Sequence, residues 1–138
     1  IVKYYNENHK NLVVLLAGKR RQYLINHLEK EGINYKYFEM VSFEELNELY
    51  NLLDLYIVSS RFEGGPQAIM ECAVSKTPII STDVGIASEI LSKNSIYSME
   101  NFNNASPDTE IAFRNVQKYV MPSGFSDFNN MFKAINEN

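Results

Sequence analysis

Two glutamates stand close together in the stretch "SSRFEGGPQAIMECA", residues 59–73. Glu63 lies in a segment rich in glycine and proline, and Glu71 follows eight positions later within an apolar run. A carboxylate can accept hydrogen bonds from vicinal hydroxyl groups, such as those of a ribose. The residue types therefore indicate a site for a ligand that carries hydroxyl groups.

The residues between the two glutamates are suited to binding an anion. Pro66 is expected at the first helical position, because its nitrogen has no hydrogen to leave unpaired. Gly64 and Gly65 remove side chains where a ligand would approach the backbone. The start of a helix offers free N–H groups and a partial positive charge, which together bind phosphate without a basic side chain. The alternative is an ordinary Gly-Pro turn that precedes a helix.

Glu71 is surrounded in sequence by apolar residues, so its helix is expected to be mostly buried. A carboxylate in such a helix costs several kcal/mol unless it is solvated or hydrogen-bonded. Glu71 is expected in the second turn, facing the same cleft as the loop; the alternative is a surface glutamate on the one exposed stripe of the helix. Glu63 precedes the helix, so the two carboxylates do not share a helix face. Two separate carboxylates near an anion site suit a ligand with hydroxyls at both ends and phosphate between them, which is the layout of a nucleotide sugar.

Strand-like and helix-like segments alternate along the chain. The run "NLVVLLAG", residues 11–18, is typical of a strand buried on both faces, as in a parallel sheet. Helix 42–54 opens with a capping box, in which Ser42 and Glu45 are three residues apart, and it has apolar residues at helical spacing from Phe43 to Leu53. The other expected strands are 34–40, 55–60, 77–82 and 95–99, and the other expected helices are 20–31, from 66 onward, 86–91, 108–120 and from 126 onward.

This alternation predicts an α/β fold with a Rossmann-like, doubly wound parallel sheet and helices on both faces. We expect one sheet ordered around strands 11–18 and 55–60. Ligands of such sheets bind at the carboxyl ends of the strands. The loop 59–65 lies at one of these ends, so it is the expected site.

Length and composition set limits on the function. The chain has 138 residues, of which 45% are hydrophobic, so one domain with a real core is expected. The net charge of −4 provides no global basic field, and we expect no nucleic-acid partner. The sequence contains no run of 18 apolar residues and no signal peptide at its start. It does not begin with Met, and we expect it to be part of a longer protein.

The remaining residues with chemical potential are few. Cys72 is the single cysteine, which fits a reducing compartment, and its apolar surroundings predict a buried packing role rather than a nucleophile. His9 and His27 show no metal-ligand spacing and are expected at the surface. No metal site is predicted.

The segment "FEGGPQAIMECA" resembles the Glu-x7-Glu motif of the family-4 (group 1) retaining glycosyltransferases, which have the GT-B fold. The surrounding segments "LVVLLAG", "VSFEELNELYNLLDLYIVSSRFEG" and "SKTPIISTDVGIASEIL" also resemble that family, in the same order. A bare Glu-x7-Glu is a weak signal, but in this order it is specific. The similarity covers about Leu12 to Ile96.

The resemblance implies roles for individual residues. Glu63 would be the catalytic-site carboxylate that contacts donor-sugar hydroxyls near the reacting carbon, and Glu71 would bind the ribose. Gly64 and Gly65 would present backbone amides to the sugar or phosphate. Pro66 and Gln67, which belong to the same motif, would lie at the donor nucleotide. No cofactor and no divalent metal are expected, since helix dipole and basic side chains would neutralise the leaving diphosphate.

Two departures from the family pattern affect phosphate binding. The Arg and Lys that clamp the diphosphate in the family belong to a segment before "LVVLLAG" and are not found in this chain. The family often has Gly-x-Gly after that strand; here Gly18 matches and Arg20 replaces the second glycine. Gly18 and Arg20 are therefore candidates for donor binding, with Lys19 as a further basic candidate. The alternative is a solvated helix start.

The resemblance implies that residues 1–138 form the C-terminal, nucleotide-sugar-binding domain of a two-domain hexosyltransferase, whose N-terminal acceptor domain is missing here. The full enzyme would transfer a sugar to a glycan or lipid-linked acceptor in polysaccharide biosynthesis, whereas this fragment alone would be inactive. We expect a cytoplasmic protein, with peripheral association at the inner face of the membrane left open. The alternatives are a nucleotide-sugar epimerase of GT-B fold and a non-catalytic nucleotide-binding or interaction module. A hydride-transferring dinucleotide enzyme is disfavoured, since no Gly-x-Gly-x-x-Gly follows a strand.

Overall fold

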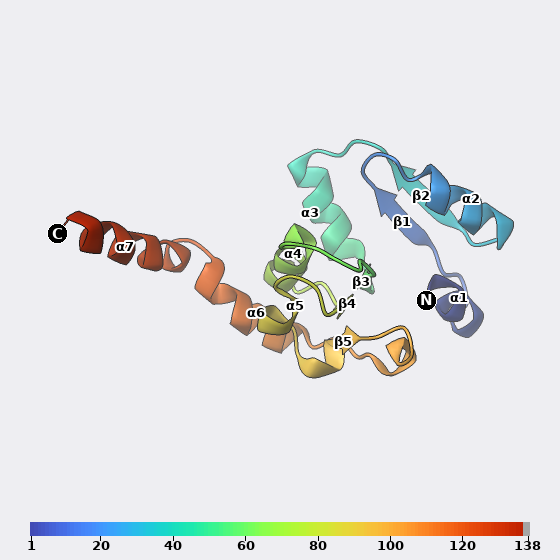
Figure 1. The fold of residues 1–138 in the computed structure, drawn as a ribbon. Coiled ribbons are helices and arrows are strands. Elements are labelled where there is room, and N and C mark those ends of the chain that lie inside the picture. Colours follow the sequence, from blue (N-terminus) through green and yellow to red (C-terminus); the bar gives the residue numbers. More distant parts are fainter. Residues whose placement is uncertain (137–138) are drawn as a thin grey trace. The chain divides into compact units, whose positions relative to one another are not determined.

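The structure is a computed structural model of the chain, and it describes residues 1–136. It divides into two compact units, Ile1–Glu48 (unit 1) and Leu49–Asn138 (unit 2). Helices and strands alternate along the chain in both units, as Figure 1 shows.

Unit 1 contains a two-stranded parallel sheet. Strand β1 (Val14–Ala17) pairs with β2 (Tyr35–Phe38), with Val14 opposite Tyr35. Helix α2 (Gln22–Lys30) connects the two strands and buries Ile25 and Leu28. Helix α1 (Val2–Asn8) precedes β1. The residues of β1 are half-buried, so the sequence-based expectation of a strand buried on both faces is not met within this unit.

Helix α3 (Phe43–Leu52) begins with the predicted capping box. The Ser42 N–H donates to the Glu45 carboxylate at 2.7 Å, and the Glu45 N–H donates to the Ser42 hydroxyl at 3.1 Å. Tyr50 is buried, as the helical spacing predicts, whereas Phe43 is 84% exposed. Phe43 is the first residue of the helix, and apolar periodicity alone does not show that another element packs against it.

Unit 2 contains a three-stranded parallel sheet in the order β3–β4–β5. Tyr56 of β3 (Tyr56–Val58) lies opposite Ile79 of β4 (Ile79–Thr82), and Ser81 of β4 lies opposite Ile96 of β5 (Ile96–Tyr97). All strand pairs within residues 1–136 are parallel. The α/β fold class with parallel strands is therefore confirmed, but β1 and β3 belong to separate sheets. In place of the single sheet expected around residues 11–18 and 55–60, β1 pairs with β2 and β3 pairs with β4.

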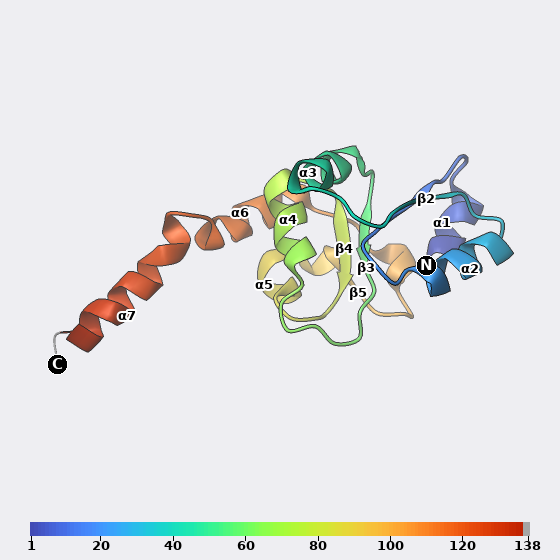
Figure 2. The same cartoon turned by 90° about the horizontal axis from the view of Figure 1, so that it is seen from above.

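Within the described residues, four helices lie wholly in unit 2, and α4 runs beside β4 (Figure 2). Helix α4 packs against both α5 and α6. The core contains Ile69 and Cys72 of α4, Ile80 of β4, Ile90 of α5 and Val116 of α6, all fully buried. These helices are α4 (Gln67–Ser75), α5 (Ala87–Ile90), α6 (Thr109–Val116) and α7 (Ser126–Asn136).

Short 3₁₀ turns complete unit 2. They span Lys93–Ser95, Phe102–Asn104, Gln117–Tyr119 and Ser123–Phe125. Asp108 caps α6 as predicted, because its side chain accepts a hydrogen bond from the Ile111 N–H at 2.9 Å. The predicted helix to Val120 ends earlier, at Val116, and continues as one of the 3₁₀ turns.

Candidate functional site

The β3–α4 loop (residues 59–66) leaves the carboxyl end of β3 and is attached to the rest of the sheet by side chains. The hydroxyl of Thr82, at the end of β4, donates to the Ser60 carbonyl at 2.7 Å. The Tyr97 hydroxyl, from β5, donates to the Val58 carbonyl at 2.8 Å. These bonds connect the start of the loop to β4 and the last residue of β3 to β5, so other strands of the sheet fix the point where the loop begins.

Glu63 is exposed on this loop, and its carboxylate is oriented by one neighbour. The Ser60 hydroxyl donates to Glu63 Oε1 at 2.8 Å. An ionised carboxylate has two oxygens and about four acceptor positions, so this bond leaves Glu63 with capacity for ligand hydroxyls.

The β3–α4 loop lies against the β4–α5 loop (residues 83–86), which leaves the carboxyl end of the next strand. The contact is close at Gly85, whose φ is +51°. A Cβ atom there would lie 2.7 Å from Pro66 Cδ and 3.1 Å from the Glu63 carbonyl oxygen. Only glycine fits both this left-handed backbone and this approach, so Gly85 permits the two loops to pack together.

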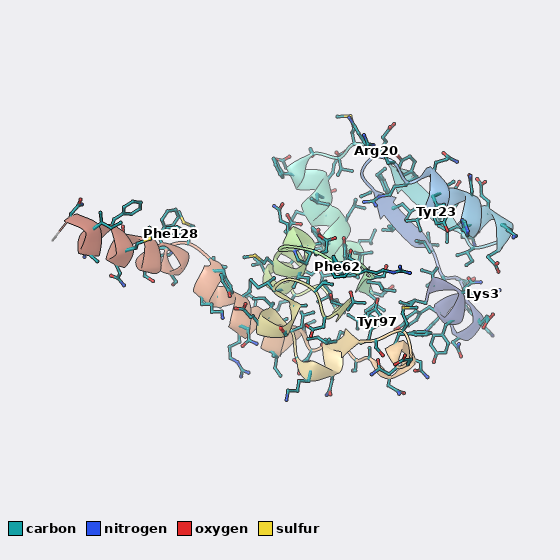
Figure 3. All side chains as sticks on the ribbon, viewed as in Figure 1. Lys3, Arg20, Tyr23, Phe62, Tyr97 and Phe128 are labelled. Atoms are coloured by element: carbon teal, nitrogen blue, oxygen red, sulfur yellow. The ribbon has the colours of Figure 1, made fainter. Side chains whose placement is uncertain are left out.

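A shallow pocket of about 400 Å³ opens between these two loops. It is lined by Arg61, Phe62, Glu63, Gly64, Asp83, Val84 and Gly85. Phe62, which is labelled in Figure 3, is 94% exposed. Two carboxylates, one guanidinium group and one aromatic ring therefore surround an open space at the carboxyl edge of the sheet. Such a lining can form hydrogen bonds with hydroxyls and a stacking contact with a ring.

Among these lining residues, only Glu63 and Gly64 are predicted from the sequence. Arg61 and Phe62 adjoin them in the same loop, and Asp83 to Gly85 follow the next parallel strand. The available signal was topological, because the carboxyl ends of neighbouring parallel strands meet at one edge. Applied to strand 77–82, this rule would have pointed to the segment that follows it.

The start of α4 differs by one position from the prediction. Pro66 is the N-cap, with φ −64° and ψ 108°, and Gln67 is the first helical residue. The extended ψ of Pro66 places it just outside the helix, which corrects its expected place at the first helical position. No side chain of the described residues caps this helix end, so its first N–H groups depend on solvent or a ligand.

Gly64 and Gly65 are exposed in front of this helix start. A Cβ atom on either would meet no heavy atom of the described chain within 4 Å. Neither glycine is therefore required by packing against neighbours, unlike Gly85. The open space beside them is compatible with the predicted approach of a ligand to the backbone.

Glu71 does not line the pocket; it is half-buried and hydrogen-bonded to α3. The Tyr50 hydroxyl donates to Glu71 Oε2 at 2.6 Å. Glu63 therefore lines the pocket, whereas Glu71 does not. The expectation that Glu71 faces the same cleft as the loop is not met. The predicted contact of Glu71 with a ribose stays a prediction.

Gly18 and Arg20 lie in unit 1, in the turn between β1 and α2 (Figure 3 labels Arg20). Gly18 has φ +89° and Arg20 has φ +64°, so both adopt the left-handed conformation. The neighbouring Arg21 closes the turn, since its Nε donates to the Ala17 carbonyl at 2.9 Å. Arg20 is exposed, and a role for Gly18 and Arg20 at the donor stays a prediction.

Cys72, His9 and His27 lie where the sequence predicted. Cys72 is fully buried, and burial raises the pKa of its thiol well above the ordinary value, followed by a smaller effect of Glu71. His9 and His27 are exposed. Among residues 1–136, no group of three His, Cys, Asp or Glu side chains is arranged to hold a metal ion. Metal-independent chemistry stays a prediction.

No helix within residues 1–136 combines the length and the apolar character needed to cross a bilayer.

Parallel strands with helical crossovers and a pocket at their carboxyl ends define an α/β domain of the Rossmann-like class. The sequence model of the glycosyl transferases group 1 family matches residues 1–106, and the chain belongs to this family. The resemblance found in the sequence is thereby confirmed.

A solved structure supports the fold. The chain is similar to a chain in "Crystal structure of GtfA/B complex", with a TM-score of 0.72 and 16% sequence identity. The match covers 99% of this chain and 32% of that chain, so the present chain spans about a third of its length. At this identity the likeness concerns the fold, and it supports a GT-B-type domain. No curated protein matches the chain.

Proposed function

We propose that the chain is the C-terminal, donor-binding half of a retaining glycosyltransferase. The enzyme would transfer a sugar from a nucleotide-diphosphate sugar to a glycan or lipid-linked acceptor. The observation that carries this proposal is the open pocket at the carboxyl ends of β3 and β4, with Glu63 in its wall, in a chain that belongs to the group 1 glycosyl transferases.

The donor sugar would occupy this pocket. Glu63, oriented by the 2.8 Å bond from Ser60, would accept hydrogen bonds from sugar hydroxyls near the reacting carbon. Asp83 lies in the pocket wall formed by the other loop and offers a second acceptor, and the exposed ring of Phe62 offers a stacking surface. Hydrogen bonds to ionised groups contribute about 1.5–3 kcal/mol each, which is enough to select a sugar by its hydroxyls.

The diphosphate would lie at the start of α4. The uncapped N–H groups around Gln67 and the backbone of Gly64 and Gly65 are the donors there, and the helix dipole adds partial positive charge. Glu71 lies four positions beyond Gln67, which is about 6 Å along a helix that rises 1.5 Å per residue. This spacing supports a layout with the sugar in the pocket, the diphosphate at the helix start and the ribose at Glu71.

In the transfer itself, the bond from the anomeric carbon to the diphosphate oxygen breaks, and the nucleoside diphosphate leaves with the bonding electrons. The acceptor hydroxyl forms the new glycosidic bond on the same face of the sugar, and its proton passes to an oxygen of the departing diphosphate. Stabilising the charge of the departing diphosphate would be the main electrostatic contribution. The basic part of that stabilisation is assigned to the rest of the two-domain enzyme. No metal is required in this scheme.

The acceptor would be held by an N-terminal domain, outside the residues printed here. We assign the enzyme to the cytoplasm, with peripheral association at the inner membrane face when the acceptor is lipid-linked.

The test is a screen of nucleoside diphosphates and their sugars against the protein that carries this chain. The expected result is binding of one nucleoside diphosphate, its release from the matching sugar donor, and a product with the anomeric configuration of the donor. Inverted configuration would refute the retaining mechanism. Interconversion of the nucleotide sugar without an acceptor would indicate an epimerase instead.

A further inference from the structure

The Glu71 carboxylate has a buried partner from another helix. Tyr50, at the end of α3, is only 7% exposed, and its hydroxyl donates to Glu71 Oε2 at 2.6 Å. Both residues belong to unit 2. This bond bridges 21 positions in the sequence, so it links two helices rather than neighbouring turns of one.

Tyr50 is itself fixed in place. Its carbonyl oxygen accepts a hydrogen bond from the buried Thr77 hydroxyl at 2.8 Å, and its ring lies 5.7 Å from that of Tyr56. The Ser75 hydroxyl lies 2.7 Å from the Thr77 hydroxyl and also 2.8 Å from the Glu71 carbonyl oxygen. The end of α3 and the body of α4 are thus joined by a set of hydrogen bonds around Tyr50 and Glu71.

The Tyr50 hydroxyl keeps its proton over the whole physiological range. Burial, and then the hydrogen bond to Glu71, raise its pKa far above the ordinary value for tyrosine. A permanently protonated hydroxyl can only donate to the carboxylate, so Glu71 Oε2 is held in one orientation. The carboxylate has about four acceptor positions, and one bond from Tyr50 leaves capacity for two ribose hydroxyls.

We propose that Tyr50 is a positioning residue that holds the Glu71 carboxylate for the ribose of the donor nucleotide. The inference rests on the proposed function, because it takes the ribose contact of Glu71 as given. It adds a requirement that the Glu-x7-Glu motif does not contain, namely a tyrosine hydroxyl supplied from the preceding helix. Tyr50 touches no reacting atom and acts through Glu71 alone.

The test compares Tyr50→Phe with wild type in the protein that carries this chain, using calorimetry with UDP, GDP and their 2′,3′-dideoxy forms. Tyr50→Phe should weaken binding of the preferred ribose form roughly 3- to 10-fold. The substitution removes the hydrogen bond that orients the Glu71 carboxylate toward the ribose. The dideoxy form lacks the hydroxyls that Glu71 would hold, so its affinity should be unchanged by the substitution.

Tyr119→Phe is the matched control. The Tyr119 hydroxyl donates to Glu89 Oε2, also at 2.6 Å and also within unit 2. Each of the two substitutions therefore removes a tyrosine hydroxyl that donates to a glutamate carboxylate. Neither Tyr119 nor Glu89 lines the pocket, and this variant should bind both forms as wild type does.

The outcomes separate the inference from the proposed function. If wild type binds the ribose and dideoxy forms equally, the ribose contact of Glu71 fails. If wild type prefers the ribose form and Tyr50→Phe keeps that preference, or weakens both forms equally, the positioning role of Tyr50 is overturned. A combined Tyr50→Phe, Glu71→Gln variant should bind the ribose form no more weakly than Glu71→Gln alone, since a residue that acts through Glu71 has no separate effect. An additive loss would also overturn the inference.

Discussion

At the scale of single residues, the two glutamates of the motif have different environments, and they should therefore have separable effects. Glu63 is exposed in the pocket and oriented by Ser60, whereas Glu71 is half-buried and oriented by Tyr50. The sequence indicated that Glu71 needs solvent or a hydrogen-bonding partner in its apolar surroundings, and that both carboxylates are candidates for binding ligand hydroxyls. It did not indicate Tyr50 as a partner, because a contact between two helices 21 positions apart leaves no trace in local periodicity.

Substitution of each glutamate by glutamine tests this division, because glutamine keeps the shape and removes the charge. Glu71→Gln should weaken binding of the bare nucleoside diphosphate about ten-fold or more, since 1.4 kcal/mol corresponds to a factor of ten. Glu63→Gln should leave that binding nearly intact and lower turnover by about ten-fold or more, since a hydrogen bond of the sugar to a charged group is lost. Calorimetry with UDP and GDP, combined with turnover on the matching sugar donor, measures both effects. Equal nucleotide affinity of wild type and Glu71→Gln would make Glu71 a structural residue only.

Cys72 provides a second prediction, concerning reactivity and pH. Its side chain is fully buried, and its thiol pKa is raised in the folded protein. The neutral thiol is favoured by folding, so this contribution to stability is complete below the pKa of the unfolded chain, about 8.5, and is lost as pH rises above it. Thiol reagents should modify native Cys72 much more slowly than the denatured chain at pH 7. Rapid labelling of the native protein would contradict the buried role. Between about pH 8 and 10, the free energy of unfolding should decrease less for Cys72→Ala than for wild type.

At the scale of elements, the site depends on two loops that follow neighbouring parallel strands. The order of strands and helices along the chain was predictable, because apolar periodicity and the Ser42 and Asp108 caps are local signals. The contact between the two loops was not, because it depends on the β3–β4 register. Gly85 has no role in the sequence-based prediction, although its close approach to Pro66 and Glu63 makes glycine necessary there.

Gly85→Ala should therefore be damaging. An alanine Cβ would lie 2.7 Å from Pro66 Cδ and 3.1 Å from the Glu63 carbonyl oxygen, on a backbone with φ +51°. The left-handed backbone costs roughly 1–2 kcal/mol, and overpacking typically adds about 1–3 kcal/mol.

Gly32→Ala separates these two contributions, because Gly32 has φ +65° and no heavy atom of the described chain within 4 Å of an added Cβ. Urea unfolding measures both variants, and nucleotide-sugar binding should fall only for Gly85→Ala. An equal loss of stability in both variants would refute the loop contact.

At the scale of the whole molecule, the alternation of elements predicted the α/β class and the parallel pairing, and both are confirmed. The division into two sheets was not predicted. An apolar run such as residues 11–18 indicates a strand, but it carries no information on which strand it will pair with. Glu48 and Leu49, where the units divide, lie within α3 and have no composition signal of a boundary.

The proposed function makes a final prediction about stability in the presence of ligand. A ligand that binds only the folded state stabilises it according to its concentration, by about 2.7 kcal/mol at 100 times its dissociation constant. The preferred nucleoside diphosphate should therefore raise the melting temperature of the protein that carries this chain, in proportion to the logarithm of its concentration. Glu71→Gln should need about ten-fold more nucleotide for the same increase. The corresponding nucleoside without phosphates is the control, and it should stabilise less because the α4 helix start has no anion to bind. If neither UDP nor GDP raises the melting temperature up to millimolar concentrations, a non-catalytic interaction module becomes the better interpretation.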